Sequence, residues 1–526
     1  MQKCTKNDTY STLSHFHNFR LKLMIEGIFV GILSGFLIVL YRITLEKAEE
    51  LRQKFILDFN GNIKLIGIWF IFLIIAAYIV GLLIKSEPMI SGSGIPQVEG
   101  ILTRKISMNW LPVVVKKFIG GVISIGAGLS LGREGPSIQL GAAVGQGVSR
   151  VFKRIKIEEK YLITSGASAG LAAAFNAPLA GVMFALEEVH KHFSPLILLS
   201  AMSASLTADF ISKYFFGLKP VFNFENIIPM PLESYGYIIL LGVIVGVFGV
   251  IYNYTLLKAQ NIYAKQKWLS VKFRPMIPFL IAGVLALILP EVLGGGHPII
   301  ESLIHGSFSI KVLLIILLGK FIFSMISYGS GAPGGIFFPL LVLGALTGAI
   351  YGNVLVNFFG FNPEFVNNFI ILAMAGYFTA IVRAPITGSI LITEMTGSFS
   401  HLLSLSVISI VAYLVADLLK SEPIYESLLD RLLKNNGREQ TSGDSKDKLI
   451  LEVPVCLDCE MDGKEIKDLD LPSDCLLVGI RRGEKEIIPN GSTTIHSGDY
   501  LLVLVNENKA ALTNEELLKI SGQPGI

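Results

Sequence analysis

The sequence is poor in charged residues and in cysteine. Only 16% of its 526 residues are Asp, Glu, Lys or Arg, against about 25% in soluble domains, and this excludes a wholly soluble protein. Its four cysteines are too few and too clustered for a disulfide-stabilised scaffold: Cys4, Cys456, Cys459 and Cys475. A net charge of +3 is too small to indicate a nucleic-acid partner.

Motifs of common enzyme classes are also missing. The sequence has no Walker loop and no HExxH pair, so we expect a protein that is not an enzyme and that holds no cofactor. The C-x-x-C pair at 456–459 would need two more ligands to bind zinc, and only Cys475 and His496 lie near it. We interpret these thiols as structural or incidental, and we expect no metal.

Apolar residues, by contrast, make up 52% of the chain. The first long run, LMIEGIFVGILSGFLIVLY, carries Glu26 and has no small-residue cleavage site, so it predicts a retained membrane helix. Further runs approach the ~20 residues that cross a bilayer, at 65–84, 235–256, 276–290, 311–327, 364–382 and 402–419. We therefore expect an all-α polytopic membrane protein.

Shorter apolar pieces, interrupted by Gly and Pro, lie between these runs. They occupy 92–104, 134–150, 163–175, 178–190, 335–351 and 385–396. We expect them to be broken helices that do not span. Irregular backbone at membrane depth is tolerated only where it is buried in protein or lines a polar cavity. The broken pieces should therefore line a path through the membrane.

The chain contains an internal repeat. GREGPSIQLGAAVG at 132–145 and GIFFPLLVLGALTG at 335–348 share one Pro and three Gly positions, and NAPLAGVMFALEE matches RAPITGSILITEM further on. Both matches keep an offset of a little over 200 residues, which argues against coincidence. The halves are about 21–220 and 230–435, and broken segments at matching places in two halves indicate a transport site.

Charged segments predict the orientation. Arg20 and Lys22 precede the first apolar run, and the positive-inside bias places such residues in the cytoplasm. The basic stretches 152–160 and 430–440 would then lie on the same side. We expect 1–20 to be a cytoplasmic N-terminal segment, both termini to be cytoplasmic, and the protein to lie in a plasma membrane, most simply a bacterial one.

A second domain follows the membrane part. The polar stretch 436–447 predicts a linker, and 448–522 contains short β-type runs separated by turn residues. Thr513 and Glu516 have the spacing of a capping box and predict the start of a final helix. This region predicts a small cytoplasmic α/β domain.

Three glycine- and proline-punctuated helix starts carry the chemistry that we expect in the membrane part. They are GSGIP at 92–96, GREGP at 132–136 and GIFFP at 335–339. Helix N-termini bind anions through free N–H groups and the helix dipole. Partial charges of this kind also let an anion leave, whereas full charges would hold it. Each motif taken singly is also compatible with close helix packing, where small residues are favoured.

These three motifs, in this order, resemble the CLC family of chloride channels and chloride/proton exchangers. The stretches GSGIPQVEG and AAAFNAPLAGVMFALEE extend the resemblance, which covers about 20–435. It implies a CLC transmembrane domain at 21–435, halves inserted with opposite topology, and a homodimer whose subunits each have a pore, with chloride and protons as substrates and lipid around them.

The resemblance also implies roles for single residues. Ser93 would bind chloride through its hydroxyl, and Tyr425 would contact the same ion through its phenol. Ile336 and Phe337 would supply backbone amides. Glu134 would be the gating glutamate, whose carboxylate occupies an anion position and swings out when it is protonated.

Glu188 would decide the mechanism. The family's exchangers pass protons through a glutamate at this position, and its channels usually lack one. The alternative is that Glu187 and Glu188 are both solvated helix ends. Glu394, the repeat equivalent of Glu187, is interpreted as a structural partner.

Two basic residues near the motifs have less distinctive roles. Lys117 follows Lys116 directly, and it matches a family lysine that biases the pore electrostatically. An equal alternative is that either lysine of this pair extends its charged end to the membrane interface. Arg133 is interpreted as a member of a structural ion pair.

The second domain departs from the paired CBS domains that many CLC proteins carry. The segment with GKEIKDL, IPNGST and GDYLLVL resembles the C-terminal subdomain of RCK/TrkA-type regulatory modules (RCK_C, TrkA-C). Such modules dimerise and often bind small ligands. The resemblance implies a small-molecule regulator, of which a cyclic dinucleotide is one example.

The combined prediction is a chloride/proton antiporter that is gated by Glu134 and coupled to protons through Glu188. An uncoupled voltage- or pH-gated chloride channel is the alternative within the family. A sensor whose membrane part only anchors the second domain is the alternative outside it, and the three intact anion motifs argue against that.

Overall fold

A computed structural model provides the coordinates. It describes residues 7–59, 62–191, 193–222, 224, 227–266, 269–306, 308–435, 448–456, 459–472, 475–483, 485–506 and 510–522. Cys4 and the linker predicted at 436–447 lie outside the described residues. The chain divides into two compact units, Met1–Leu432 and Leu433–Ile526, and each is described by itself.

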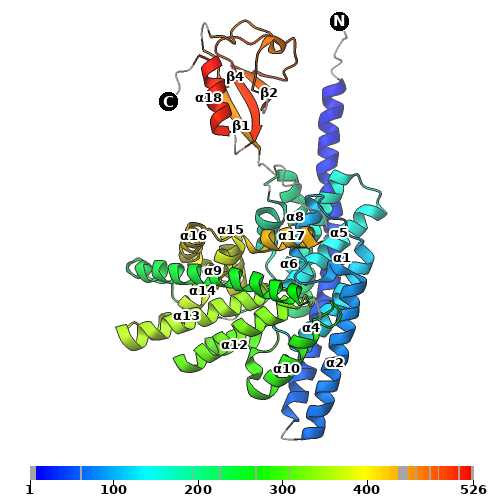
Figure 1. Cartoon of the computed structure of the whole chain (residues 1–526), viewed down its shortest axis with the longest axis vertical. Coiled ribbons are helices and arrows are strands. Elements are labelled where there is room, and N and C mark those ends of the chain that lie inside the picture. The colour runs from blue at the N-terminus through cyan, green and yellow to red at the C-terminus, as the bar shows by residue number, and fades with distance from the viewer. Residues whose placement is uncertain are drawn as a thin grey trace. The chain divides into compact units, whose positions relative to one another are not determined.

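The first unit is helical (Figure 1). Its first half contains α1 (Asn7–Leu57), α2 (Ile63–Ser86), α3 (Ile95–Leu102), α4 (Trp110–Gly126), α5 (Glu134–Val151), α6 (Lys156–Phe175), α7 (Pro178–Phe184) and α8 (Pro195–Phe216). The second half contains α9 (Tyr235–Lys265), α10 (Met276–Ile288), α11 (His297–His305), α12 (Ile310–Gly329), α13 (Phe337–Phe359), α14 (Val366–Val382), α15 (Pro385–Thr396) and α16 (Leu402–Leu418). The helix α17 (Ile424–Asn435) follows.

The packing of these helices repeats between the halves. Helix α5 packs on α6 as α13 packs on α14, and α1 packs on α8 as α9 packs on α16. Helices α6 and α7 contact each other, as α14 and α15 do, and α7 touches α15 across the two halves. The repeat inferred from sequence is therefore a repeat of structure.

Glycines at the repeated positions let the helices approach closely. A β-carbon at Gly141 or at Gly145 would collide with a backbone carbonyl of α6. A β-carbon at Gly344 or at Gly348 would likewise meet a backbone carbonyl of α14, at 2.8 Å for Gly344. Small residues are favoured at membrane helix interfaces for this reason. These four glycines serve packing.

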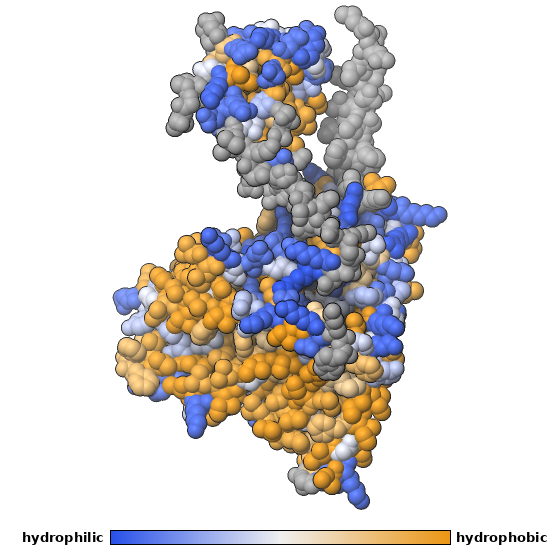
Figure 2. Space-filling view, viewed as in Figure 1, coloured by the Kyte–Doolittle hydropathy of each residue, from blue (hydrophilic) through white to orange (hydrophobic). Residues whose placement is uncertain are grey.

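Within the described ranges, eight helices are long and apolar enough to cross a membrane. Figure 2 shows hydrophobic side chains over much of the visible face of the first unit. Exposed apolar residues lie on α2, α9 and α12, among others, and lipid contact explains their exposure.

Several predicted spans need correction. Helix α8 was not predicted from the sequence, but it is one of the eight. The run at 276–290 forms only the 13-residue α10, which is too short to span alone. Conversely, the piece at 335–351 extends into the 23-residue α13, and the piece at 163–175 belongs to the 20-residue α6.

The second unit is a small antiparallel sheet with one helix against it. Its strands are β1 (Lys448–Pro454), β2 (Cys475–Arg482), β3 (Lys485–Ile487) and β4 (Tyr500–Asn506), in the order β1-β4-β2-β3. Alternate residues of β4 point into a core with helix α18 (Ala510–Ile520). The predicted capping box was wrong, because α18 already begins at Ala510 and Thr513 lies inside its first turn.

Candidate functional site

The three motifs that we expected to begin helices do so. Gly94 has a left-handed backbone (φ 96°) and precedes α3. Helix α5 begins at Glu134 and α13 at Phe337. Each has its proline within the first turn, where the missing N–H does no harm. All three starts are buried.

Two backbone hydrogen bonds join the starts of α5 and α13. The amide of Gly132 donates to the carbonyl of Gly335 and the amide of Gly335 to that of Gly132, both at 2.7 Å. A β-carbon at Gly135 would lie 2.5 Å from the hydroxyl oxygen of Ser93 and 3.2 Å from the Cα of Gly335. Motifs far apart in sequence therefore meet at one place.

Two hydroxyls near this place are buried without a hydrogen-bond partner. Ser93 is 1% exposed and Tyr425 is fully buried, and neither side-chain oxygen has a partner among the described residues. A buried hydroxyl without a partner is costly. Both side chains are therefore suited to contact a bound ion.

The residues that were expected to supply amides also lie here. Ile336 immediately precedes α13 and Phe337 is its first residue, and both are buried. The first N–H groups of a helix have no partner within the helix. The ring of Phe184 lies 6.0 Å from the ring of Phe337 and 6.5 Å from that of Tyr425, so Tyr425 belongs to the same cluster.

Glu134 lies at the edge of this cluster. Its carboxylate is close to the backbone N of Phe338, since a β-carbon at Gly132 would meet both Glu134 Oε2 and, at 3.0 Å, Phe338 N. Oε2 is buried without a partner that meets hydrogen-bond geometry. A carboxylate thus occupies the position next to a helix N-terminus where an anion would bind. The sequence analysis missed the amide of Phe338.

Glu134 also lines a cavity of about 610 Å³. Ser93, Tyr425 and Glu188 are not among its lining residues. Glu134 therefore contacts the cavity, whereas the side chains of Ser93, Tyr425 and Glu188 do not line it. We call this cavity the vestibule.

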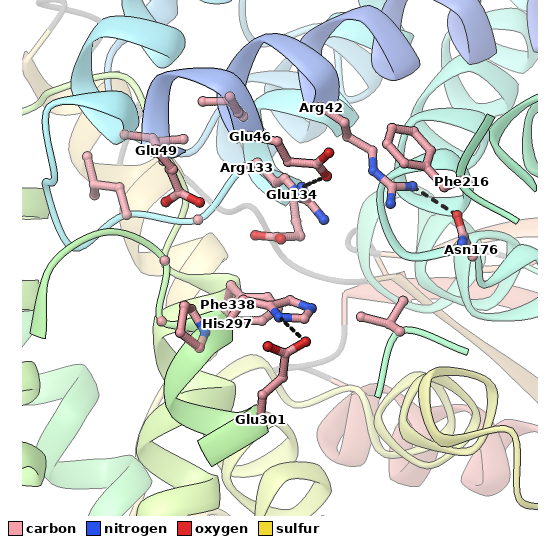
Figure 3. A pocket seen from close by; sticks show the side chains of 18 of the residues that line it. Arg42, Glu46, Glu49, Arg133, Glu134, Asn176, Phe216, His297, Glu301 and Phe338 are labelled. Atoms are coloured by element: carbon pink, nitrogen blue, oxygen red, sulfur yellow. Dashed lines mark hydrogen bonds and ion pairs between the residues drawn. The ribbon is translucent and has the colours of Figure 1, made fainter. Parts of the chain in front are cut away.

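The vestibule is rich in charged groups, and Figure 3 shows them around Glu134. Arg133 pairs with Glu46 at 3.3 Å, which confirms a structural ion pair. The ring of His297 stacks on that of Phe338 at 5.7 Å. Its Nδ1 lies 3.4 Å from a carboxylate oxygen of Glu301.

Glu188 lies outside the residues that line the vestibule. It lies in a π-helical turn, Ala185–His190, that follows α7, and such turns are frequent at functional sites. It is 4% exposed, and its Oε1 has no partner among the described residues. The alternative of a solvated helix end is wrong for Glu188.

That alternative is also wrong for Glu187. Its carboxylate accepts hydrogen bonds from the N–H groups of Ile386 at 3.2 Å and Thr387 at 2.7 Å. Glu394 accepts from the N–H groups of Leu179 at 3.1 Å and Ala180 at 2.8 Å. Both glutamates cap helices, and the structural role expected for Glu394 is confirmed.

Lys117 does not snorkel. Its ammonium is fully buried and donates to the carbonyls of Ile90 at 2.9 Å and Gly92 at 2.7 Å. It thereby holds the loop that precedes Ser93. Its repeat equivalent, Lys320, is also fully buried and holds the loop before α11 by two carbonyls in the same way; the sequence analysis missed this lysine.

One sequence match has no functional counterpart. The stretch Gly166–Gly170 has the G-x-S-x-G spacing of a hydrolase nucleophile. It lies within helix α6, where β-carbons at Gly166 and Gly170 would collide with α5. A nucleophile of this type needs a strand-to-helix turn, so this serine is a packing residue.

In the second unit, Arg482 and Asp499 form a bidentate ion pair at 2.8 and 2.7 Å. Burial would raise the pKa of Asp499, but the Arg482 guanidinium and the N–H of His496 hold it below its usual range. Within the described residues, no three His, Cys, Asp or Glu side chains gather into a metal-binding group.

The chain matches two known families. Residues 75–417 match the family described as voltage gated chloride channel. Residues 450–518 match the TrkA-C domain. The two matches fall on the two structural units.

The similarity to known proteins extends over most of the chain. The H(+)/Cl(−) exchange transporter ClcA of Vibrio cholerae (strain M66-2) is 36% identical over 428 residues, which cover 79% of this chain and 90% of the relative. The transporter of the same name from Yersinia pseudotuberculosis is 31% identical, over 82% of this chain and 92% of the relative. A solved structure of a slow cyanobacterial Cl−/H+ antiporter matches with a TM-score of 0.73 and 30% identity, over 79% of this chain and 99% of that one.

Proposed function

Because the chain belongs to the voltage gated chloride channel family, we propose that it is a membrane transporter that exchanges chloride for protons. The observation that carries the proposal is the position of Glu134. A carboxylate lies beside a helix N-terminus, between a charged vestibule and a buried cluster of unpartnered hydroxyls. The relatives that are named H+/Cl− exchange transporters support the same function.

The buried cluster binds chloride. The hydroxyls of Ser93 and Tyr425 donate to the ion, and the amides of Ile336 and Phe337 aim the positive end of α13 at it. None of these groups carries a full charge. The ion is therefore bound well enough to enter and weakly enough to leave.

Glu134 is the gate. When it is charged, its carboxylate occupies the anion position beside Phe338 and blocks the way to the vestibule. When it takes a proton from the vestibule, it loses its attraction to the helix N-terminus. Chloride can then replace it, so one site alternates between a proton-carrying acid and an anion.

Glu188 passes protons at the other end. It lies off the chloride path, and a buried carboxylate without full partners is costly in its charged form, so it readily takes up a proton. A second buried acid distinguishes an exchanger from an uncoupled channel. No residue of the cluster forms a covalent intermediate in this scheme, and chloride is the bound substrate.

Reconstitution into liposomes tests the proposal. A chloride gradient should drive protons uphill in the wild type. Glu188→Gln should abolish proton movement while chloride flux persists, since the anion cluster is intact. Glu134→Ala should give chloride flux without proton coupling, because the gate is gone. Chloride flux without proton movement in the wild type would establish a channel instead.

The second unit is a regulatory domain in this proposal. Its TrkA-C match supports a domain that binds a small ligand. Removing 440–526 should leave basal exchange in place and abolish its response to the effector. Unchanged transport in the truncated protein under every effector tested would refute a regulatory role.

The setting is a bacterial plasma membrane, with both termini in the cytoplasm and the protein a homodimer in lipid. Bacterial relatives, and the eight apolar helices found among the described residues, support the multi-pass membrane location. Cysteine accessibility on intact cells tests the orientation: a thiol introduced at Lys434 should react only after the membrane is permeabilised. Cross-linking in native membranes tests the dimer.

A further inference from the structure

One ammonium group joins three parts of the proposed site. Lys191 follows the π-helical turn that carries Glu188, and its backbone is left-handed (φ 54°). This conformation is uncommon for a residue other than glycine. Its Nζ lies 2.7 Å from Glu99 Oε1 and also contacts Glu426 Oε1. We call these three side chains the Lys191 bridge.

The partners of Lys191 come from the elements that hold the chloride cluster. Glu99 lies on α3, directly after the loop that holds Ser93. Glu426 lies on α17, next to Tyr425. The Lys191 bridge thus ties together the backbone segments that carry both hydroxyl ligands and the buried acid.

Exposure increases along the bridge. The side chain of Glu99 is 7% exposed, that of Lys191 33% and that of Glu426 47%. Glu99 Oε2 is buried without a partner, as Glu188 Oε1 is. Lys191 and Glu426 are therefore the more exposed members of the bridge, and Lys191 supplies the positive charge next to the buried carboxyl group of Glu99.

The charges that act on Glu188 define what the bridge does. They are those of Lys191, Glu99, Glu426 and Glu187. Glu187 is already held by the N–H groups of α15. Lys105 also acts on Glu99, but Lys191 is the cation among the charges that act on Glu188. Without Lys191, the negative charges of Glu99 and Glu426 would make Glu188 hold its proton more tightly.

We infer that Lys191 is a positioning residue of the exchange reaction: it acts through Glu188, beside which its charge compensates those of Glu99 and Glu426. The inference rests on the proposed function. Lys191 touches neither chloride nor the transported proton. Its effect is on the number of protons that move with each chloride.

The test compares single lysine variants of the full-length protein in liposomes, with proton and chloride fluxes measured together. Lys191→Met should lower the proton-to-chloride ratio by at least about twofold, the loss expected for one partly exposed ion-pair network. Lys191→Arg should restore the ratio, since a guanidinium can bridge two carboxylates. Lys434→Met, an exposed lysine on the same helix as Glu426, is the matched control and should behave as the wild type.

The outcomes separate the inference from the proposed function. A wild type without exchange refutes the proposed function. A wild type that exchanges, with an unchanged ratio in Lys191→Met, overturns the inference alone. A proportional loss of both fluxes in Lys191→Met also overturns it, because that is the mark of a purely structural role.

Chloride binding to the purified variants by calorimetry checks the anion cluster, and near wild-type affinity in Lys191→Met supports an effect on coupling. If Lys191→Met does not fold, Lys191→Gln replaces it, because an amide keeps a hydrogen-bonding group at this position and removes only the charge. An unchanged ratio in Lys191→Gln would then overturn the inference.

Discussion

Glu187 and Glu394 each cap a helix that belongs to the other half of the membrane unit. Glu187 accepts from the N–H of Thr387 at 2.7 Å, and Glu394 from that of Ala180 at 2.8 Å. The two carboxylates thus satisfy orphan amides at α15 and α7. They stabilise the contact between the halves.

Glu187→Gln should therefore cost stability without affecting proton coupling. An amide accepts the same N–H bonds less strongly than a carboxylate does, by about 1 kcal/mol. Thermal unfolding of the purified protein should show the loss, and the proton-to-chloride ratio should stay at the wild-type value. The same substitution at the next residue, Glu188→Gln, should do the reverse. A loss of proton coupling in Glu187→Gln would show that the proton path was assigned to the wrong glutamate.

Because the hydroxyls of Ser93 and Tyr425 have no partner among the described residues, removing either one should weaken chloride binding without lowering stability. Ser93→Ala and Tyr425→Phe remove no hydrogen bond within the protein, so the unfolding temperature should change little. Each should weaken chloride binding by about 10- to 150-fold, the value of one hydrogen bond to a charged group. Calorimetric titration with chloride measures both variants. A large fall in the unfolding temperature with unchanged affinity would show that these hydroxyls are structural.

Gly135 predicts a steric effect on the same site. Its substitution by alanine would place a methyl group 2.5 Å from the hydroxyl oxygen of Ser93, in the space where the proposed chloride ion would contact Ser93. Gly135→Ala should reduce chloride affinity and transport at least about tenfold. Gly67→Ala is the matched control, because nothing lies within 4 Å of its new β-carbon. Equal transport by the two variants would contradict the assigned ion position.

Asp499 predicts a pH dependence in the second unit. The pKa of Asp499 is below its usual 3.8, since Arg482 outweighs the effect of burial. The stabilisation of the second unit by the charged Asp499 is therefore complete above pH 3.8. It is lost as the pH falls through the pKa of Asp499 in the folded state, which is lower. Asp499→Asn should destabilise this unit by about 1.5–3 kcal/mol, equally at pH 7 and pH 5.

Hydrogen exchange of peptides from 475–506 in the full-length protein measures this loss. Glu486→Gln, which changes an exposed carboxylate on β3, should leave exchange unchanged. A difference between Asp499→Asn and the wild type that disappears already at pH 5 would mean that the folded-state pKa is not lowered.

The sequence predicted the helix starts of the site well, because Gly, Pro and apolar spacing are local signals. Helix α8 was missed because its hydroxyl residues, Asp209 and Lys213 interrupt its apolar pattern. In the structure its hydroxyl groups have hydrogen-bond partners. Ser205 donates to the carbonyl of Pro178 and Ser212 to that of Ala173, at 2.8 and 3.0 Å.

Residues that act through distant partners were not predictable in the same way. Lys191 bridges Glu99 and Glu426, which lie far from it on either side in the sequence, and no local pattern marks them. Lys320 was missed because its loop has glycine where the matching loop has Ser93. In the second unit, Thr513 resembled a helix cap only because the residues before it carry no strong signal.

The paired hydrogen bonds between Gly132 and Gly335 limit how this protein can move. They fasten the two halves where the gate and the anion-binding helix begin. A rocking motion that separated the halves at this point would break two buried hydrogen bonds. It would also move the starts of α5 and α13 apart and so disrupt the site. In the proposed mechanism, access to the two sides therefore alternates through side-chain movement around a fixed backbone: chloride and the Glu134 carboxylate change places while the two halves stay joined.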